Sequence, residues 1–321
     1  MSGSRVCRAA ALIALFVALS GSHSPAETRT IKFIVPFPAG GGADVLMRTL
    51  SDRWAQTYGI TNVVENRPGG ASVIGLEAAS RAAPDGNTLV VAANSFVVHA
   101  NFKKLSYDPL TSFEPICLMA NSPQVLVVNS ASPYRKLNDL IEAARAKPGA
   151  ISHASAGPAS AQHIGFEQLK LMAKINMVFV PFPGNTPALN SLLGGHVDSV
   201  VANYSEAAEL VKSGKLRALA ALGDKRIEAW PDVATAAEQG FKGFSVEAWY
   251  GLLAPAKTPK DKVAELSKWC SDGMKAADLK PKWELQGLDP VGSSSEDFAA
   301  HLRKQAADYA QVIREADIKG D

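Results

Sequence analysis

Short apolar strands alternate with amphipathic helices along this chain, and this alternation constrains the fold more than any other feature of the sequence. Residues 31–35 are β-branched and aromatic and predict a strand, and a loop ending in three consecutive glycines follows at 36–42. The helix that opens next has an apolar face with the helical period, formed by Leu46, Met47, Leu50 and Trp54. Strands at 62–65 and 88–93 flank a helix at 73–83, which predicts a doubly wound, mainly parallel α/β sheet.

The second half of the chain repeats this pattern. Strands are predicted at 124–128, 151–154, 177–180, 197–202 and 216–222, and helices at 137–146 and 160–173. An apolar, aromatic run at 246–254 precedes a helical tail from about residue 259, in which Ser294 and Asp297 have the spacing of a helix cap. No Gly/Ser-rich linker separates the halves. Strands that cross between two domains therefore fit better than two independent domains.

The first 26 residues predict a secretory signal peptide rather than part of the fold. Arg5 and Arg8 precede an apolar stretch at 9–19, and small residues stand before a cut after Ala26. Eleven apolar residues are too few to span a bilayer as a helix, although an N-terminal membrane anchor remains the alternative. Cleavage would leave 295 residues and would remove both arginines and no acidic residue, so the formal net charge falls from +2 to zero. This charge gives no indication of nucleic-acid binding.

Two cysteines remain after cleavage, Cys117 and Cys270. An exported protein can form disulfides, and a bridge between these two would close a loop of about 150 residues, for which chain entropy gives roughly 4–5 kcal/mol of stabilisation. Two buried free thiols are the alternative, and the sequence leaves both open. Neither cysteine has a second one nearby, so a CxxC zinc or redox motif is excluded for both.

The glycine-rich loop is the strongest candidate for a binding site. Glycine lets backbone N–H groups approach a ligand closely, and the start of a helix adds a partial positive charge. Together they predict an anion site that needs no basic side chain. The sequence is neither a Walker A loop nor a clean GxGxxG motif, and a tight turn without a ligand is the alternative. The candidate residues are Phe37, Pro38, Ala39, Gly40, Gly41, Gly42, Ala43 and Asp44.

A second loop has the same strand–loop–helix layout. Its candidates are Ser155, Gly157, Ala159, Ser160 and His163. Two such loops, one in each half of the chain, would clamp a carboxylate from both sides of a cleft. For Ser155 and Ser160 taken singly, capping of the following helix is the alternative.

Further candidates lie near predicted strand ends, where open α/β sheets bind ligands. They are Ser95, Phe182, Gly184, Asn185, Asn203 and Trp249. Enzyme motifs are weak: there is no GxSxG elbow and no HExxH motif, and no metal site or cofactor is predicted. A hydrolytic pair of Ser160 and His163 is conceivable, but neighbours at i and i+3 at a helix start rarely place a base correctly.

The ordered motifs of this chain resemble one family, the extracytoplasmic solute receptors of tripartite tricarboxylate transporters, or Bug/TctC-like proteins. The resemblance covers essentially the whole chain after residue 26. The matching segments are 34–44 (IVPFPAGGGAD), 64–70 (VENRPGG), 82–86 (AAPDG), 107–109 (YDP), 154–157 (ASAG), His163, 192–198 (LLGGHVD), 214–220 (GKLRALA), 230–235 (WPDVAT) and 251–256 (GLLAPA).

This resemblance implies a two-lobed periplasmic binding protein of type II-like architecture, built from two doubly wound α/β domains with two interdomain crossovers near 117–125 and 244–253. Domain 1 would comprise 27–122 plus 248–321, and domain 2 would comprise 123–247. The resemblance further implies a monomer that holds an organic carboxylate through the backbone amides of both loops and delivers it to the subunits of a membrane permease. A sensory receptor that presents its ligand to a membrane kinase would have the same cleft.

Two positions depart from the usual family pattern. Phe182-Pro183-Gly184 stands where the family often has Tyr-Lys-Gly, and Ala202 stands where an acidic residue often precedes the asparagine. Both changes remove polar groups from the expected cleft. They suggest a carboxylate without an amino group, with an apolar or aromatic body.

Overall fold

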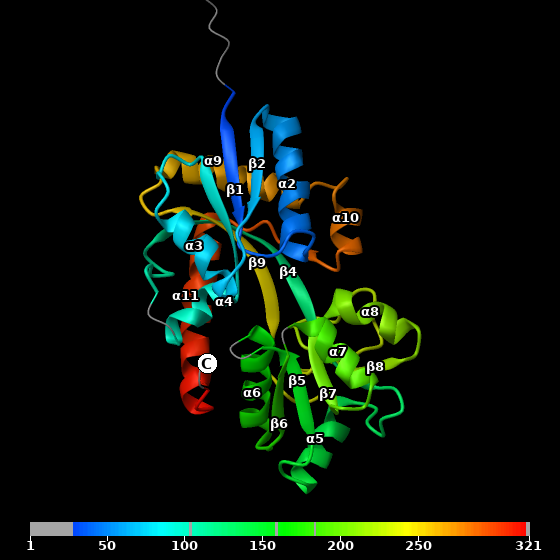
Figure 1. Ribbon diagram of the computed structural model, residues 1–321. Coiled ribbons are helices and arrows are strands. Elements are labelled where there is room, and N and C mark those ends of the chain that lie inside the picture. Colours follow the sequence, from blue (N-terminus) through cyan, green and yellow to red (C-terminus); the bar gives the residue numbers. More distant parts are fainter. Residues whose placement is uncertain (1–27, 103–104, 158–159, 183, 319–321) are drawn as a thin grey trace, which may run out of the picture.

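The computed structural model describes residues 28–102, 105–157, 160–182 and 184–318. These residues form two α/β lobes joined by two long strands, as Figure 1 shows. The predicted signal peptide and Ala159 lie outside the described residues. Within the described part, no helix is both long enough and apolar enough to cross a membrane.

The sheet of the first lobe is parallel on one side and antiparallel on the other. The parallel side has three strands, in the order β2 (Thr61–Asn66) at the edge, β1 (Thr30–Val35) and β3 (Thr88–Ala93). Strand β9 (Glu247–Pro255) pairs antiparallel with β3 and with β4 (Phe113–Asn129), and the short β10 (Asp289–Pro290) pairs with β4. The predicted parallel strands are therefore present, with antiparallel strands added beside them.

Helices cover both faces of this sheet. Alternate residues of β1 point to opposite faces, so Phe33 packs in one hydrophobic cluster with Trp54, whereas Ile34 packs in another with Phe298. The helices of this lobe are α2 (Gly42–Tyr58), α3 (Val73–Ser80), α4 (Ser95–Val98), α9 (Lys260–Met274), α10 (Lys280–Leu285) and α11 (Ser295–Glu315). The predicted helical tail is thus three helices interrupted by β10. The predicted cap is confirmed, because Ser294 Oγ accepts the N–H of Asp297 at 3.0 Å.

The second lobe repeats the strand–helix arrangement. Its parallel strands are β5 (Ser152–Ala156), β6 (Val178–Phe182) and β7 (Ser199–Asn203), and β8 (Leu216–Ala221) pairs antiparallel with β4. Its helices are α5 (Leu137–Ala146), α6 (Ala161–Ala173), α7 (Asn185–Leu193) and α8 (Tyr204–Lys212). Two hydrophobic clusters fill this lobe, one of them around Leu140 and Phe166 and the other around Val200 and Leu189.

Strand β4 belongs to both lobes. Its residues up to Pro123 pair with β9, and from Gln124 onward they pair with β7 and β8. The sequence predicted only 124–128 as a strand, because prolines and polar residues interrupt the apolar pattern before it. The pairing of this earlier part is irregular, with register shifts between Pro115 and Cys117 and between Leu118 and Ala120.

A disulfide joins Cys117 of β4 to Cys270 of α9, and both residues are fully buried. The structure therefore has the bridge rather than two free thiols. The bond fixes a helix from late in the chain to the long strand that leaves the first lobe. This places the C-terminal helices on the first lobe.

The last helix, α11, reaches from the first lobe to the second. Phe298, near its start, packs in the core of the first lobe. Val312 and Ile313, near its end, form a small apolar cluster with Val98 and with Ile164 of α6. Figure 1 shows α11 running past the connecting strands and ending beside α6. The lobes are therefore in contact at a point outside the two connecting strands.

Candidate functional site

Helices follow the carboxyl ends of the parallel strands in both lobes. In the first lobe α2 follows β1, α3 follows β2 and the four-residue α4 follows β3. In the second lobe α6 follows β5, α7 follows β6 and α8 follows β7. The first four N–H groups of a helix have no partner within the helix, and the helix dipole adds partial positive charge there. Together these helix starts make the region between the lobes suited to an anion.

Two glycines of the first-lobe loop differ in what a side chain there would meet. Gly40 has a φ of 78°, in the left-handed region that glycine adopts without strain. At Gly42, the first residue of α2, a Cβ would lie 3.3 Å from the hydroxyl of Tyr250. The start of α2 is therefore open at its backbone and close to β9.

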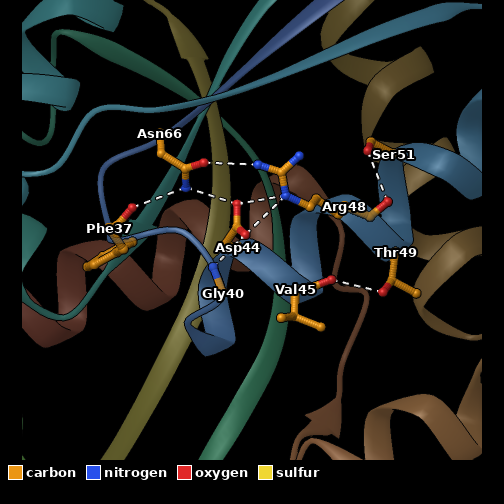
Figure 2. Close-up of polar contacts among 8 residues, drawn as sticks. All are labelled: Phe37, Gly40, Asp44, Val45, Arg48, Thr49, Ser51 and Asn66. Atoms are coloured by element: carbon orange, nitrogen blue, oxygen red, sulfur yellow. Dashed lines mark hydrogen bonds and ion pairs between the residues drawn. The ribbon is translucent and has the colours of Figure 1, made fainter.

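Asp44 holds this loop in place, as Figure 2 shows. Its carboxylate accepts hydrogen bonds from the Gly40 N–H at 2.8 Å and from Asn66 Nδ2 at 2.9 Å, and it forms an ion pair with Arg48 at 3.0 Å. Asn66 Nδ2 also donates to the carbonyl of Phe37, so both ends of the loop are tied to one network. Asp44 is buried and occupied by these donors, so its role here is to position the loop.

The ionisation of Asp44 follows from the same contacts. Burial alone would raise the pKa of this carboxyl group. Hydrogen bonds from Arg48, the Gly40 backbone and Asn66 outweigh the burial and hold the pKa below its usual value. The network therefore contains a stable negative charge beside the loop.

In the second loop, the two candidate serines differ in their hydrogen bonds. Ser160 Oγ accepts the N–H of His163 at 3.1 Å and so caps α6. Ser155, at the end of β5, is fully buried, and its Oγ has no hydrogen-bond partner among the described residues. Gly157 follows with a φ of 69°. Capping thus accounts for Ser160 but not for Ser155.

His163 lies on α6 in an aromatic and charged setting. Its ring stacks on Phe179 with the centroids 3.8 Å apart, and its Nε2 is 3.7 Å from Glu167 Oε1. Lys170 forms a closer ion pair with the same carboxylate, at 2.7 Å. The hydrogen bond between Ser160 and His163 uses the backbone of His163, which is the geometry of a cap.

The start of α7 brings three of the predicted residues together. Phe182 ends β6 and is partly buried against the apolar cluster around Leu189. Gly184 precedes α7 with a φ of 148°. Asn185, the first residue of the helix, is buried, and its Oδ1 has no partner among the described residues.

Sequence reasoning missed a polar network that runs from Asn203 into β4. Gln162 Nε2 donates to Gln124 Oε1 at 3.0 Å, and Gln124 Nε2 donates to Asn203 Oδ1 at 2.7 Å. Asn203 Nδ2 in turn donates to Glu206 Oε1 at 3.2 Å. Gln124 is fully buried where β4 enters the second lobe, so the network connects the strand that joins the lobes to the starts of α6 and α8.

Sequence reasoning also missed Glu206 of the second lobe and Tyr250 of the first lobe, which interact electrostatically. Burial and the nearby charge of Glu206 raise the pKa of Tyr250 to about 12. Loss of hydration raises the pKa of Glu206 itself, against hydrogen bonds from Asn185 and Asn203. The spacing Asn203-x-x-Glu206 after a strand resembles a helix-capping pattern and was the one available signal.

Two further predicted contacts have partners within the first lobe. Trp249 is fully buried, packs edge-on against Phe298 and donates a hydrogen bond from its Nε1 to Gln305 Oε1. Its contact with a ligand stays a prediction. Ser95 Oγ lies 3.0 Å from Ser72 Oγ at the start of α4. Nowhere in the described ranges do three His, Cys, Asp or Glu side chains gather as they would around a metal ion.

Two α/β lobes, two connecting strands and helix starts gathered between the lobes define a protein of the periplasmic binding protein class. The chain belongs to the family of tripartite tricarboxylate transporter receptors (TctC), whose model matches residues 46–318. The resemblance drawn from the sequence motifs and the predicted two-lobed α/β fold are both confirmed.

Individual proteins support this assignment. BugT of Bordetella pertussis is 32% identical, with 97% of this chain and 98% of BugT covered. The solved periplasmic binding protein BugD is 31% identical and has a TM-score of 0.76, with 91% of this chain and 99% of BugD covered.

Two similar structures contain carboxylates. An R. palustris protein with adipate is 28% identical with a TM-score of 0.80, covering 91% of this chain and 99% of its own. MatC from Rhodopseudomonas palustris with bound malate is 28% identical with a TM-score of 0.73, covering 89% of this chain and 99% of its own.

Proposed function

We propose that this protein is a periplasmic receptor that binds an organic carboxylate between its lobes and delivers it to a membrane permease of the tripartite tricarboxylate type. The observation that carries the proposal is the buried hydroxyl of Ser155, which has no hydrogen-bond partner among the described residues and lies at the end of β5, in the lobe that does not contain the glycine loop. Adipate and malate in the two similar structures support a carboxylate as the ligand class.

Binding would depend on local dipoles rather than on the net charge. Backbone N–H groups of the loop at Gly40–Gly42 would donate to one side of the carboxylate, and the start of α6 with Ser155 would donate to the other. Asp44 keeps the first set of donors in position. Because the donors belong to different lobes, a bound carboxylate would favour the closed arrangement of the lobes.

The proposal includes removal of residues 1–26 on export, a monomeric receptor and no catalysis. Domain bounds of 27–122 with 248–321, and 123–247, are supported by the change of pairing partner along β4 at Pro123 and Gln124. A sensory role with a membrane kinase as partner would use the same cleft. A hydrolase is disfavoured because Ser160 Oγ is engaged as a helix cap.

The ligand class is tested by native mass spectrometry of the purified protein and by thermal shift with aliphatic mono-, di- and tricarboxylates and aromatic acids. We expect saturable binding of at least one carboxylate, without turnover. If uncharged amides of these acids stabilise the protein as strongly as the acids do, the anion site is wrong.

Ser155→Ala provides a sharper test. Removing a buried hydroxyl that has no partner should leave the melting temperature unchanged or higher, because no internal hydrogen bond is lost. Removing a ligand donor should weaken binding by about tenfold. Ser199→Ala is the matched control, since Ser199 is buried on the adjacent strand β7 and donates to the carbonyl of Ser152. The control should lower stability and leave affinity unchanged, and the same pattern in Ser155→Ala would contradict the proposal.

A further inference from the structure

Asn185 is a buried acceptor without a donor. More than nine-tenths of this residue is buried, and its Oδ1 has no hydrogen-bond partner among the described residues. Its side chain is a neighbour of Glu206, whose pKa it lowers against the effect of burial. An unpaired buried carbonyl oxygen is costly to a folded protein, so its presence at the start of α7 indicates that a donor arrives from outside the fold.

Glu206 adds a second acceptor beside the first. Its carboxylate receives hydrogen bonds from Asn185 and Asn203, and a carboxylate has about four lone-pair positions. Glu206 keeps solvent-exposed surface, although its surroundings remove enough hydration to raise the pKa of its carboxyl group, so a ligand can still reach this residue. Asn203 does not compete for that donor, because its Oδ1 already accepts from Gln124.

Strand register places these acceptors at the same edge of the second-lobe sheet as Ser155. Strands β5, β6 and β7 are parallel, and Ser155 is in register with Pro181 of β6, shortly before Asn185. In the first lobe, burial and the charge of Glu206 raise the pKa of Tyr250, whose hydroxyl lies 3.3 Å from the position that a Cβ at Gly42 would take. The proposed site therefore contains two kinds of groups. The backbone N–H groups and Ser155 can donate hydrogen bonds to a ligand, whereas Asn185 Oδ1 and Glu206 can accept them.

We propose that Asn185 and Glu206 form an acceptor subsite that selects ligands carrying a proton-donating substituent, a hydroxyl or an ammonium group, on the carbon chain next to the bound carboxylate. This inference rests on the proposed function and makes these two residues determinants of specificity. It also revises the hypothesis drawn from Ala202. The acidic group absent from that position is supplied four residues later, from the first turn of α8.

The test uses isothermal titration calorimetry with three dicarboxylate skeletons, each unsubstituted, 2-hydroxylated and 2-aminated. The nine probes are succinate, malate, aspartate, glutarate, 2-hydroxyglutarate, glutamate, adipate, 2-hydroxyadipate and 2-aminoadipate. We expect one substituted member to bind at least about tenfold more tightly than its unsubstituted parent. Comparing the hydroxy and amino members shows whether the subsite prefers a hydroxyl or an ammonium group.

Two variants assign that preference to the subsite. Glu206→Gln removes the charge and keeps the shape, so it should lower affinity for the amino acid about tenfold or more and affect the hydroxy acid less. Asn185→Ala should lower affinity for either substituted acid. In each variant, the ratio of affinities for the substituted acid and its unsubstituted parent separates loss of the subsite from a general loss of binding. Glu209→Gln is the matched control, because Glu209 is an exposed residue of α8 whose carboxylate is 3.7 Å from Lys212.

Equal affinity for substituted and unsubstituted acids in the natural protein would overturn the inference, and so would a preference that persists in both variants. Binding of none of the nine probes would also overturn it. The proposed function is judged separately, by the wider panel of acids and by Ser155→Ala. A protein that binds an unsubstituted or aromatic acid with no preference for a donor would keep the proposed function and lose the subsite.

Discussion

Asp44 shows how one side chain determines the geometry of the glycine loop. The sequence places an acidic residue in the first turn of a helix, where it also favours the helix dipole. The structure adds what the sequence could not supply, namely the hydrogen bonds that join Asp44 to Gly40 and Asn66. A residue predicted as a ligand contact therefore has a positioning role, which explains why it is buried.

We expect Asp44→Asn to weaken both folding and carboxylate binding. The amide keeps the shape but has one acceptor oxygen, so it can no longer accept from the Gly40 N–H and from Asn66 Nδ2, which bond to different carboxylate oxygens; this loss should cost about 1–3 kcal/mol of unfolding free energy at pH 7. Urea unfolding and calorimetry measure the two effects. Asp52→Asn on the same helix is the control, because Asp52 is exposed and accepts one hydrogen bond, from Asn62 at 3.3 Å. Unchanged carboxylate affinity in Asp44→Asn would contradict the positioning role.

His153 is a second residue whose burial has a measurable consequence. It is fully buried on β5 and stacks on Phe166 with ring centroids 3.3 Å apart, and its Nε2 has no partner among the described residues. Burial, with the charges of His163 and Lys170, holds the pKa of His153 well below its usual value. The folded protein therefore keeps this ring neutral where an unfolded chain would protonate it.

The sign of the pH dependence follows from this difference. Below the ordinary histidine pKa of about 6.5, the unfolded chain binds a proton that the folded chain excludes, so stability falls as the pH falls from about 6.5 to 5. In His153→Phe, the loss of unfolding free energy per pH unit should be smaller than in the natural protein by up to about 1.4 kcal/mol. Urea unfolding at several pH values measures it. The same slope in His153→Phe would show that His153 does not titrate with folding.

At the scale of elements, β4 is the strand on which both lobes depend. It pairs with β9 and β10 in one lobe and with β7 and β8 in the other, and it carries one half of the disulfide. Its first half was not predicted, because Pro115, Asn121 and Pro123 break the apolar pattern by which strands are recognised. Pairing on both sides compensates for that weak local preference.

Removing the disulfide should destabilise the protein without changing its fold. Cys117 and Cys270 are 153 residues apart, and a loop of this length contributes about 5 kcal/mol in the chain-entropy model, near the upper end of measured values. The double variant Cys117→Ser/Cys270→Ser and the reduced natural protein should therefore lose about 2–5 kcal/mol of unfolding free energy. Equal urea midpoints for oxidised and reduced protein would contradict this expectation.

At the scale of the whole molecule, the lobes are linked by more than their two strands. The end of α11 contacts α6 through the apolar cluster of Val312, Ile313 and Ile164, so a helix of the first lobe rests on a helix of the second. A hinge rotation that opens the cleft would have to separate or shear this contact. The cluster therefore contributes to the balance between open and closed arrangements.

The variant Val312→Ala/Ile313→Ala should shift this balance toward the open arrangement. Less apolar surface would be buried between the lobes, at about 25 cal/mol per Å². Small-angle scattering should report a larger radius of gyration without ligand, and carboxylate affinity should fall several-fold. Leu171→Ala on α6 is the control, because Leu171 is 40% exposed and lies outside this cluster. An unchanged radius of gyration would mean that the cluster does not resist opening.

Sequence periodicity was enough for the elements whose pattern is local. The strand at 31–35, the helix after the glycines and the Ser294 cap all depend on residues within one or two turns of each other, and all are present. The candidate site was predicted less completely. The loops at 36–44 and 155–163 were correctly placed at strand ends, but the sequence could not separate the capping Ser160 from the unpartnered Ser155.

The sequence by itself determined the α/β class, the strand–loop–helix units and the family, because apolar periodicity, glycine positions and ordered motifs are properties of short segments. Tertiary structure alone decided which groups come together across the chain. It buried Trp249, joined Cys117 to Cys270, and brought Glu206 near Tyr250 of the other lobe. Such contacts depend on strand pairing and on packing between residues far apart in sequence, which no local pattern records.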